Sequence, residues 1–302
     1  MTTPLSDFLT YQLSLNHSEA TVEWYRYQLQ RYLKWLGDRP HTTGNVRAYL
    51  AASRSGDKEA GKKGNRPATV AGHWRALRTW YQFLTAEGHI DANPMEGVME
   101  PKVPDTEPRR AQLNEYLMLL DSIERRTWLD VRDRLVITVL FLCGVRRSEA
   151  ARLLPSDFRV DDHYLLVRQG KGGGDRRIPL LPAVERVLVE YLFVRPPSTI
   201  PQLFIGANGH GSSGDYALTS TGIYQMLRRR CRVAGLRTLN PHSFRHGLAM
   251  YLLNEAGADM SLVQRILGHS QITTTVRYYA QWLDKGVFRE YSERMKIVGG
   301  VK

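Results

Sequence analysis

Residues whose types suit chemistry on a phosphate occur in four short stretches of the second half of the chain. The first, CGVRRSE at residues 143–149, follows an apolar run, and its glycine predicts the end of one helix and a junction at Arg146. An arginine at such a junction presents a planar fork of donors to a phosphate, and Glu149 could hold it in place. The second, GKGGG at residues 170–174, puts Lys171 at the tip of a predicted hairpin, where it could protonate a leaving oxygen.

The other two stretches follow predicted helix boundaries. In NPHSFRH, residues 240–246, Asn before Pro predicts a helix start, with His242 in the first turn and Arg245 one turn later on the same face. The amino end of a helix also favours anions. In LGHSQITTTVRYY, residues 267–279, His269 follows a helix-ending glycine and Tyr278 lies along the next element.

Taken one at a time, these stretches have ordinary structural alternatives. Arg146 and Glu149 could form a surface ion pair, and Lys171 could lie in a solvated turn. A single histidine or tyrosine, such as His269 or Tyr278, usually packs against its own domain. The GKGGG stretch does not fit a phosphate-binding nucleotide loop, because a glycine follows the lysine where that loop carries Ser or Thr.

A metal site is a further alternative at the histidines. His242 and His246 are four residues apart, and His269 could supply a third nitrogen. However, Ser243 stands where a zinc protease carries its catalytic glutamate, and a cationic Arg245 between two ligands would repel a metal ion. We therefore expect no metal and no other cofactor.

The charge of the chain favours a polyanionic partner. Its 42 Lys and Arg against 30 Asp and Glu give a formal net charge of +12 and a pI near 9.8, as is typical of proteins that bind nucleic acid. A merely soluble basic protein is the simpler alternative. Residues 1–100 hold 12 basic and 10 acidic residues and residues 101–302 hold 30 and 20, so most of the excess lies in the second half.

Cysteine content and hydropathy exclude several classes of protein. Cys143 and Cys231 are the only cysteines, which predicts neither a disulfide framework nor a cysteine zinc site and fits a reducing compartment. The longest apolar run, residues 135–145, is too short to span a bilayer, and the amino terminus lacks a signal pattern. We expect a soluble, cytoplasmic protein.

The length of 302 residues favours two domains. In the first half, the periodicity predicts a helix from Ser18 to Gly37, a short helix near 46–52 and a helix over 68–86, with a glycine- and lysine-rich loop at 56–67. We expect a four-helix domain over residues 1–96. Three prolines in PKVPDTEPRR predict a stiff, exposed linker over residues 97–110.

The second predicted domain, residues 111–302, has a mixed pattern. Short strands at 163–168 and 176–180 predict a small antiparallel hairpin around the glycine-rich turn. Helical patterns cover most of the remainder, near residues 112–125, 128–142, 147–153, 182–194, 219–234, 241–256, 259–267, 272–281 and 284–296.

In their order along the chain, the four stretches resemble the tyrosine recombinase (phage integrase) family, whose site reads Arg, Lys, His-x-x-Arg, His or Trp, and Tyr. The matching residues are Arg146, Lys171, His242, Arg245, His269 and Tyr278. The first half, which ends in Asn93-Pro94, is similar to the family's core-binding domain. The resemblance implies a mainly α fold with a small antiparallel β-sheet (α+β), in which a helical core-binding domain and a catalytic domain form a C-shaped clamp.

The resemblance also implies a role for each matching residue. Tyr278 would attack the scissile phosphate and leave a 3′-phosphotyrosine with a free 5′-hydroxyl. Arg146 and Arg245 would neutralise the oxygens of the crowded transition state. Lys171 would be the general acid for the departing 5′ oxygen.

Three further residues would assist, and a few positions depart from the family's pattern. His242 and His269 would help proton transfer and hydrogen-bond the phosphate, with Glu149 in a supporting role. The departures are Cys143 in place of a common threonine, Phe244 in place of a common leucine, and Tyr279 beside Tyr278. The spacing from residues 267–269 favours Tyr278 as the nucleophile.

The function implied is that of a site-specific DNA recombinase acting in integration, excision or resolution of DNA elements. Because a phosphotyrosine stores roughly the free energy of the bond it replaces, rejoining would need neither ATP nor a metal. The partners implied are double-stranded DNA, further copies of the chain in a tetrameric synapse and accessory DNA-bending proteins, with a monomer or weak dimer in the free state. The last predicted helix could join protomers or pack on its own domain.

Other functions fit parts of the same pattern. A type IB topoisomerase uses related Tyr and Arg chemistry but only relaxes supercoils, and a hairpin-forming telomere resolvase is usually a larger relative. A DNA-binding regulator with an inactive site is the alternative from another class, against which the complete set of six residues argues.

Overall fold

The structure is a computed structural model that describes residues 4–57, 62–104, 109–168, 174–208 and 212–268. The chain divides into two compact units, Met1–Thr106 and Glu107–Lys302. Helices predominate in both, with short antiparallel strands between them, so the expected mainly α fold with small antiparallel sheets is confirmed. None of the helices within the described ranges combines the length and apolarity needed to cross a bilayer.

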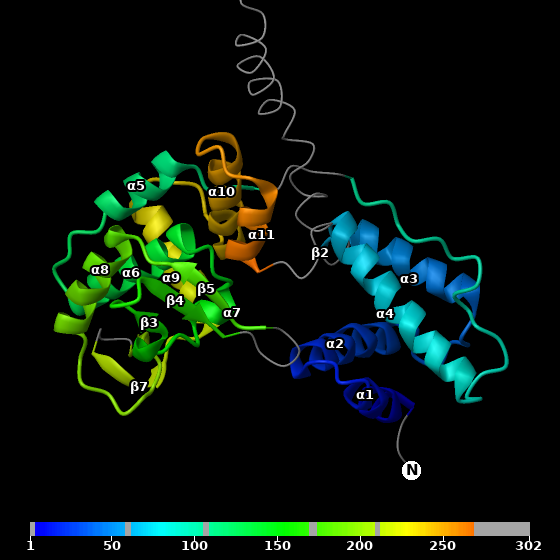
Figure 1. Cartoon of the computed structure of the whole chain (residues 1–302). Helices are drawn as coiled ribbons and strands as arrows, with labels where there is room; N and C mark the ends of the chain where they lie inside the picture. The colour runs from blue at the N-terminus through cyan, green and yellow to red at the C-terminus, as the bar shows by residue number, and fades with distance from the viewer. Residues whose placement is uncertain (1–3, 58–61, 105–108, 169–173, 209–211, 269–302) are drawn as a thin grey trace, which may run out of the picture. The chain divides into compact units, whose positions relative to one another are not determined.

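Four helices make up most of the first unit: α1 (Pro4–Ser14), α2 (Glu19–Leu36), α3 (Thr43–Ser55) and α4 (Pro67–Ala86) (Figure 1). The predicted start of α2 is confirmed, because the Ser18 hydroxyl accepts a hydrogen bond from the backbone N–H of Thr21 at 3.2 Å. Gly37 ends α2 with a positive φ of 56°. Helix α3 is longer at both ends than the predicted 46–52.

Aromatic side chains fill the core of this unit. Tyr32, Trp80 and Tyr81 are almost completely buried, and the hydroxyls of Tyr32 and Tyr81 lie 2.7 Å apart. The stretch 56–67 was predicted to be a loop throughout. That prediction is wrong in part, because β1 (Gly56–Asp57) and β2 (Lys62–Lys63) pair antiparallel within it. Strands of two residues carry no periodicity that a sequence pattern can reveal.

The second unit is built around α6 (Trp128–Leu142), whose residues from Val131 to Phe141 are all buried. From residue 135 onward this helix belongs to the apolar run 135–145 noted in the sequence, and a helix that is apolar on every face packs within the core. The others are α5 (Leu113–Asp121), α7 (Arg147–Ala150), α8 (Pro182–Val194), α9 (Ser220–Val233), α10 (Pro241–Asn254) and α11 (Met260–Leu267), with a 3-10 turn η1 at Pro155–Asp157. The cysteines at the end of α6 and within α9 are free and buried. The predicted helices near 272–281 and 284–296 lie outside the described residues.

The predicted hairpin is present as β4 (Tyr164–Val167) paired with β5 (Arg176–Pro179), with Val167 opposite Arg176. A third strand, β3 (Phe158–Arg159), pairs with β4 and was not predicted, again because it has only two residues. A second sheet, β6 (Ile205–Ala207) with β7 (Ser213–Ala217), was also missed. Glycines at 206 and 214 weaken its strand pattern, and the ring of Tyr216 explains them: a Cβ at either position would lie within 2.2 Å of a ring carbon.

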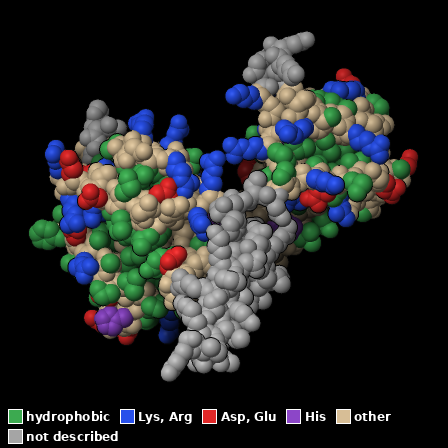
Figure 2. Space-filling view, turned by 90° about the horizontal axis from the view of Figure 1, so that it is seen from above, with side chains coloured by type: hydrophobic (Ala, Val, Ile, Leu, Met, Phe, Trp, Pro, Cys, Tyr) green, Lys and Arg blue, Asp and Glu red, His purple; other side chains and the backbone are tan. Residues whose placement is uncertain are grey.

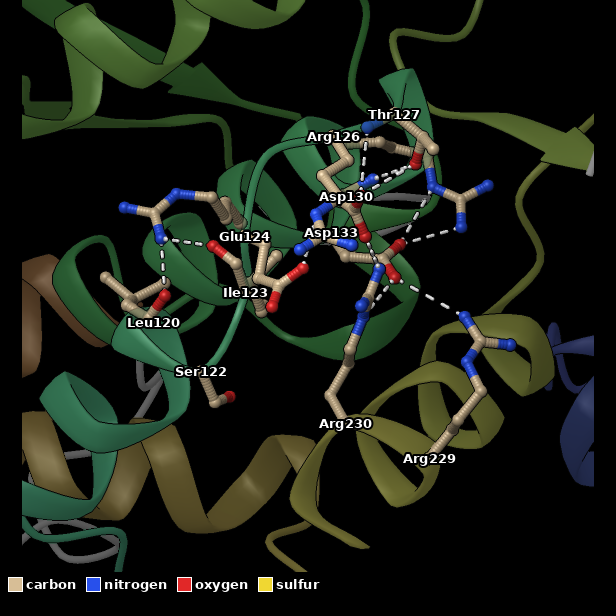
Figure 3. Close-up of polar contacts among 12 residues, drawn as sticks. Leu120, Ser122, Ile123, Glu124, Arg126, Thr127, Asp130, Asp133, Arg229 and Arg230 are labelled. Atoms are coloured by element: carbon tan, nitrogen blue, oxygen red, sulfur yellow. Dashed lines mark hydrogen bonds and ion pairs between the residues drawn. The ribbon is translucent and has the colours of Figure 1, made fainter. Parts of the chain in front are cut away.

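A buried ion cluster joins α6 to α9 (Figure 3). The carboxylate of Asp133, which has no exposed surface, accepts from Arg132 Nη2 at 2.7 Å and from Arg230 Nε at 2.8 Å. Arg230 Nη2 also donates to Asp130 Oδ1 at 2.7 Å, and Arg229 lies beside Asp133 at 3.4 Å. The side chains of Asp133 and Arg230 are largely removed from water, where charges are tolerated only when they are paired, and their ion pair links α9 to α6.

The segment before α5 lies directly on helix α10. The backbone N–H of Ala111 donates to the carbonyl of Ser243 at 2.7 Å. One turn further along α10, a Cβ at Gly247 would lie 2.0 Å from the carbonyl oxygen of Ala111. Only glycine allows this approach, so the start of the second unit is fixed to the helix that carries His242 and Arg245.

The Gly247→Ala substitution tests this contact. We expect it to lower the free energy of unfolding of the second unit by about 1–3 kcal/mol, because the added methyl forces the two backbones apart. Gly44→Ala in α3 is the matched control, since a Cβ there meets nothing closer than 3.8 Å. The control should change stability by no more than about 1 kcal/mol, in the stabilising direction. If both substitutions change the free energy of unfolding in urea by the same amount, the close contact between Gly247 and Ala111 does not contribute to stability.

Candidate active site

A tight turn after α6 positions Arg146. Gly144 adopts a positive φ of 59°, and a Cβ there would lie 2.8 Å from a methyl of Leu248 and 2.9 Å from a methyl of Leu267. The positive φ favours glycine here, and a larger residue would also have to displace the ends of these two leucine side chains. Arg146 follows in an extended conformation as the residue that precedes α7, which confirms the predicted helix junction.

The predicted contact between Arg146 and Glu149 is present. Arg146 Nη1 donates to Glu149 Oε1 at 2.8 Å, and the backbone N–H of Arg146 donates to Oε2 at 2.7 Å. The Arg146 side chain is 36% exposed and that of Glu149 only 4%. The carboxylate thus fixes the guanidinium from the protein side, while part of the guanidinium remains accessible.

A second arginine, which the sequence analysis did not assign to the site, binds the same carboxylate. Arg176 Nη1 and Nη2 donate to the two oxygens of Glu149 at 3.0 and 2.7 Å, and the Arg176 side chain is 7% exposed. The signal for it was the alternation of β5, in which Arg176 and Ile178 are buried while Arg177 is exposed. An arginine on a buried strand face needs hydrogen-bond acceptors around its guanidinium, and a carboxylate is the strongest of these.

Helix α10 carries the third arginine. Its start is confirmed as predicted, because the Asn240 side chain accepts from the backbone N–H of Ser243 at 2.9 Å. His242 in the first turn is exposed, and Arg245 one turn later is 5% exposed. Arg245 Nη1 donates to the carbonyl of Gly144 at 2.7 Å, so α10 is fixed to the turn that precedes Arg146.

The three arginines converge on the carboxyl end of α11, which ends at Gly268 in the left-handed conformation as the sequence predicted. The pairs are Arg176 Nε with the carbonyl oxygen of Ile266 at 3.0 Å, Arg245 Nη2 with that of Leu267, and Arg146 Nη2 with that of Gly268 at 3.1 Å. The last carbonyls of a helix lack intrahelical partners and carry partial negative charge, so cations stabilise them. This arrangement fixes the backbone immediately before His269.

The protonation states follow from these neighbours. Burial raises the pKa of Glu149, but hydrogen bonds and charge from Arg176, together with those from Arg146, outweigh burial and lower the pKa to about 2. Protein atoms cover part of the His242 ring, and this desolvation lowers its pKa. The positive charges of nearby arginines, Arg245 first, lower it further. Burial, followed by His242 and Arg245, lowers the pKa of His246 to about 4. The carboxylate is therefore ionised and both imidazoles are neutral near pH 7.

The structure brings four of the predicted residues together: Arg146, Glu149, His242 and Arg245. The other three, Lys171, His269 and Tyr278, lie outside the described residues. The roles assigned to all seven remain predictions. In the described ranges no group of three or more His, Cys, Asp or Glu side chains is placed to hold a metal ion.

Both parts of the chain match known families. The phage integrase family model matches residues 109–284, and the model of the phage integrase N-terminal SAM-like domain matches residues 5–88. The tyrosine recombinase XerD of Listeria innocua serovar 6a is 32% identical over 224 residues, covering 72% of this chain and 73% of that protein. XerD of Listeria monocytogenes serovar 1/2a is 32% identical over 287 residues, covering 91% and 92%.

A solved structure has a similar fold. It is that of a lambda integrase dimer bound to a COC′ core site, and it matches with a TM-score of 0.67 at 22% identity over 90% of this chain and 95% of that chain. At this identity the likeness concerns the fold.

Glu149→Ala tests the electrostatic account of the site. Removing the carboxylate leaves the buried Arg176 without an opposite charge, which we expect to destabilise the second unit by about 3–5 kcal/mol in chemical denaturation. Glu124→Ala is the matched control, because the Glu124 side chain is 62% exposed and pairs with Arg126 at the surface. The control should cost less than about 1 kcal/mol. Similar costs for the two variants would show that Glu149 does not hold the arginines.

Proposed function

The chain belongs to the tyrosine recombinase (phage integrase) family, enzymes that cleave and rejoin DNA strands, and from this premise we propose that Tyr278 is the nucleophile of a site-specific recombination reaction. The tyrosine oxygen attacks the scissile phosphorus and loses its proton, while the bond from phosphorus to the 5′ oxygen breaks. The product is a 3′-phosphotyrosine and a free 5′-hydroxyl. A 5′-hydroxyl from the partner strand then reverses the step, so the number of phosphodiester-type bonds is conserved.

The convergence of Arg146 and Arg245 at the end of α11, with His242 one turn before Arg245 on α10, is the observation that carries this proposal. A phosphorane-like transition state gains negative charge on its equatorial oxygens, and preorganised cations stabilise it. Arg146 and His242 are the accessible groups, so they would contact the phosphate oxygens directly. Arg245 is buried beneath them, where its charge is less screened than in water.

The remaining groups complete the proton transfers in this proposal. A neutral His242 can accept a proton near pH 7, and its ring N–H can donate a hydrogen bond to a phosphate oxygen. Lys171, in the loop between β4 and β5, is the general acid for the departing 5′ oxygen. His269 directly follows the carbonyls that the arginines bind, and its imidazole would hydrogen-bond the phosphate.

We further propose that the substrate is duplex DNA and that four protomers act together on two synapsed sites. The net charge of +12 supports a polyanionic substrate, and on the face drawn in Figure 2 Lys and Arg side chains occur over both units. Each recombination event cleaves two strands at each of two sites, which requires four nucleophiles. The lambda integrase relative binds its core site as a dimer, which supports assembly on DNA. Accessory DNA-bending proteins and a cytoplasmic location belong to the same proposal.

Tyr278→Phe is the direct test of the nucleophile. Incubation with a library of nicked suicide duplexes of randomised sequence should yield covalent protein–DNA adducts with the wild type and none with this variant, because the attacking oxygen is absent. Tyr279→Phe is the matched control and should form adducts like the wild type. Adducts that persist in Tyr278→Phe and vanish in Tyr279→Phe would assign the reaction to the neighbouring residue.

The DNA sequence recovered from the covalent adducts, here called the captured sequence, allows a test of the reaction class. A plasmid carrying two copies of it should be converted to recombinant products by the wild type, since strand exchange needs two sites. A plasmid lacking the sequence is the control and should remain supercoiled. Relaxation of both plasmids without recombinants would identify a topoisomerase and contradict the proposal.

A further inference from the structure

Arg176 binds two separate elements from the buried face of β5. Its two terminal nitrogens donate to the Glu149 carboxylate in α7, and its Nε donates to the carbonyl of Ile266 in α11. The side chain is 7% exposed, so it is not placed to meet a substrate directly. A planar guanidinium can bind a carboxylate through two nitrogens and a third acceptor through Nε, which the point charge of a lysine cannot do.

The carboxylate of Glu149 is shared equally between two arginines. Its Oε1 accepts from Arg146 Nη1 and Arg176 Nη1, and its Oε2 accepts from the Arg146 backbone N–H and Arg176 Nη2. All four distances lie between 2.7 and 3.0 Å. Each oxygen therefore accepts one hydrogen bond from each arginine. Arg176 limits the positions that Glu149 can adopt, and Glu149 in turn limits those of Arg146.

Arg176 also lies at the base of the loop that contains Lys171. Its strand partner is Val167, so the chain from residue 168 to residue 175 leaves and returns at this pair. The same side chain therefore joins the base of this loop to the carboxylate behind Arg146 and to the backbone before His269. Supporting contacts of this kind set how precisely reacting groups are held.

We infer that Arg176 is a positioning residue of the recombination reaction, which acts through Glu149 and the end of α11 to hold Arg146 against the scissile phosphate. This inference rests on the proposed function. It assigns no contact with DNA to Arg176. Substitution of Arg176 should therefore slow the cleavage of bound DNA without weakening the binding of DNA.

Arg176→Lys tests the inference in the full-length chain, with the captured duplex as a nicked suicide substrate at saturating protein. We expect the rate constant for adduct formation to fall roughly 10- to 100-fold, because the charge is kept but the fork that fixes Glu149 is lost. The Kd for the same duplex should stay within about threefold of the wild-type value.

Arg177→Lys is the matched control. Arg177 is the next residue of β5, it is exposed, and its guanidinium lies 4.9 Å from the centre of the Tyr164 ring. Its cleavage rate constant should stay within about threefold of the wild-type value, since its side chain points to the other face of the strand. Thermal melts of both variants report on their folding.

A pH profile separates positioning through Glu149 from a general loss of stability. Removing a cation raises the pKa of Glu149 from about 2 toward its ordinary value, so Arg176→Gln should lose Glu149 ionisation as the pH falls. Because the ordinary pKa of a glutamate is near 4.5, the ratio of variant to wild-type cleavage rate constants should be constant from about pH 8 to about pH 6 and should decrease as the pH falls below about 5. In the double variant Arg176→Gln with Glu149→Gln, position 149 carries no carboxyl group, so the ratio should not change with pH.

The outcomes distinguish this inference from the proposed function. If the wild type forms no adduct, the proposed function fails. If the wild type cleaves and Arg176→Lys cleaves within about threefold of it, the inference is overturned. If Arg176→Lys is unfolded at the assay temperature, the pH dependence of the cleavage rate ratio in the single and double glutamine variants decides. A difference between the two profiles supports the inference, and identical profiles overturn it.

Discussion

The rest of the site depends on one buried carboxylate, that of Glu149. It receives hydrogen bonds from two arginines that come from different parts of the chain, one beside α7 and one in β5. A carboxylate with a pKa near 2 stays ionised throughout the physiological range, so the attraction that orders both guanidiniums is permanent. Without it, two cations would have to share a confined space with Arg245 nearby, and their mutual repulsion would separate them.

The three arginines in turn fix the carboxyl end of α11. Each donates to one of three successive carbonyls at residues 266–268, and the helix dipole adds to the attraction. The cations are therefore held by the backbone as well as by Glu149. Such an array needs little rearrangement when negative charge develops nearby, which is the property that electrostatic catalysis requires. Two of the arginines lie on or beside α10 and α7, and both of these helices pack against the buried helix α6.

Local signals in the sequence predicted the boundaries that matter for the site. Ser18, Asn240 and Gly268 begin or end helices as expected, because capping depends on one residue and its immediate neighbours. Arg176 was missed because its partner, Glu149, lies 27 residues away, and no local pattern states which acid a buried arginine will meet. Strands β3, β6 and β7 were missed because they are short or contain glycines that make room for the ring of Tyr216. The roles of Lys171, His269 and Tyr278 still rest on the sequence.

The central claim is that a scissile phosphate binds to the accessible side of Arg146, the guanidinium that Glu149 holds, with Arg245 and His242 of α10 contributing to the same site. An experimental structure of the wild-type chain trapped on its captured DNA tests this most directly. We expect a non-bridging oxygen of the phosphate attached to Tyr278 within about 3.2 Å of an Arg146 nitrogen, with Glu149 still bound to both Arg146 and Arg176. A trapped phosphate remote from Arg146, or a Glu149 side chain turned away from both arginines, would contradict the account.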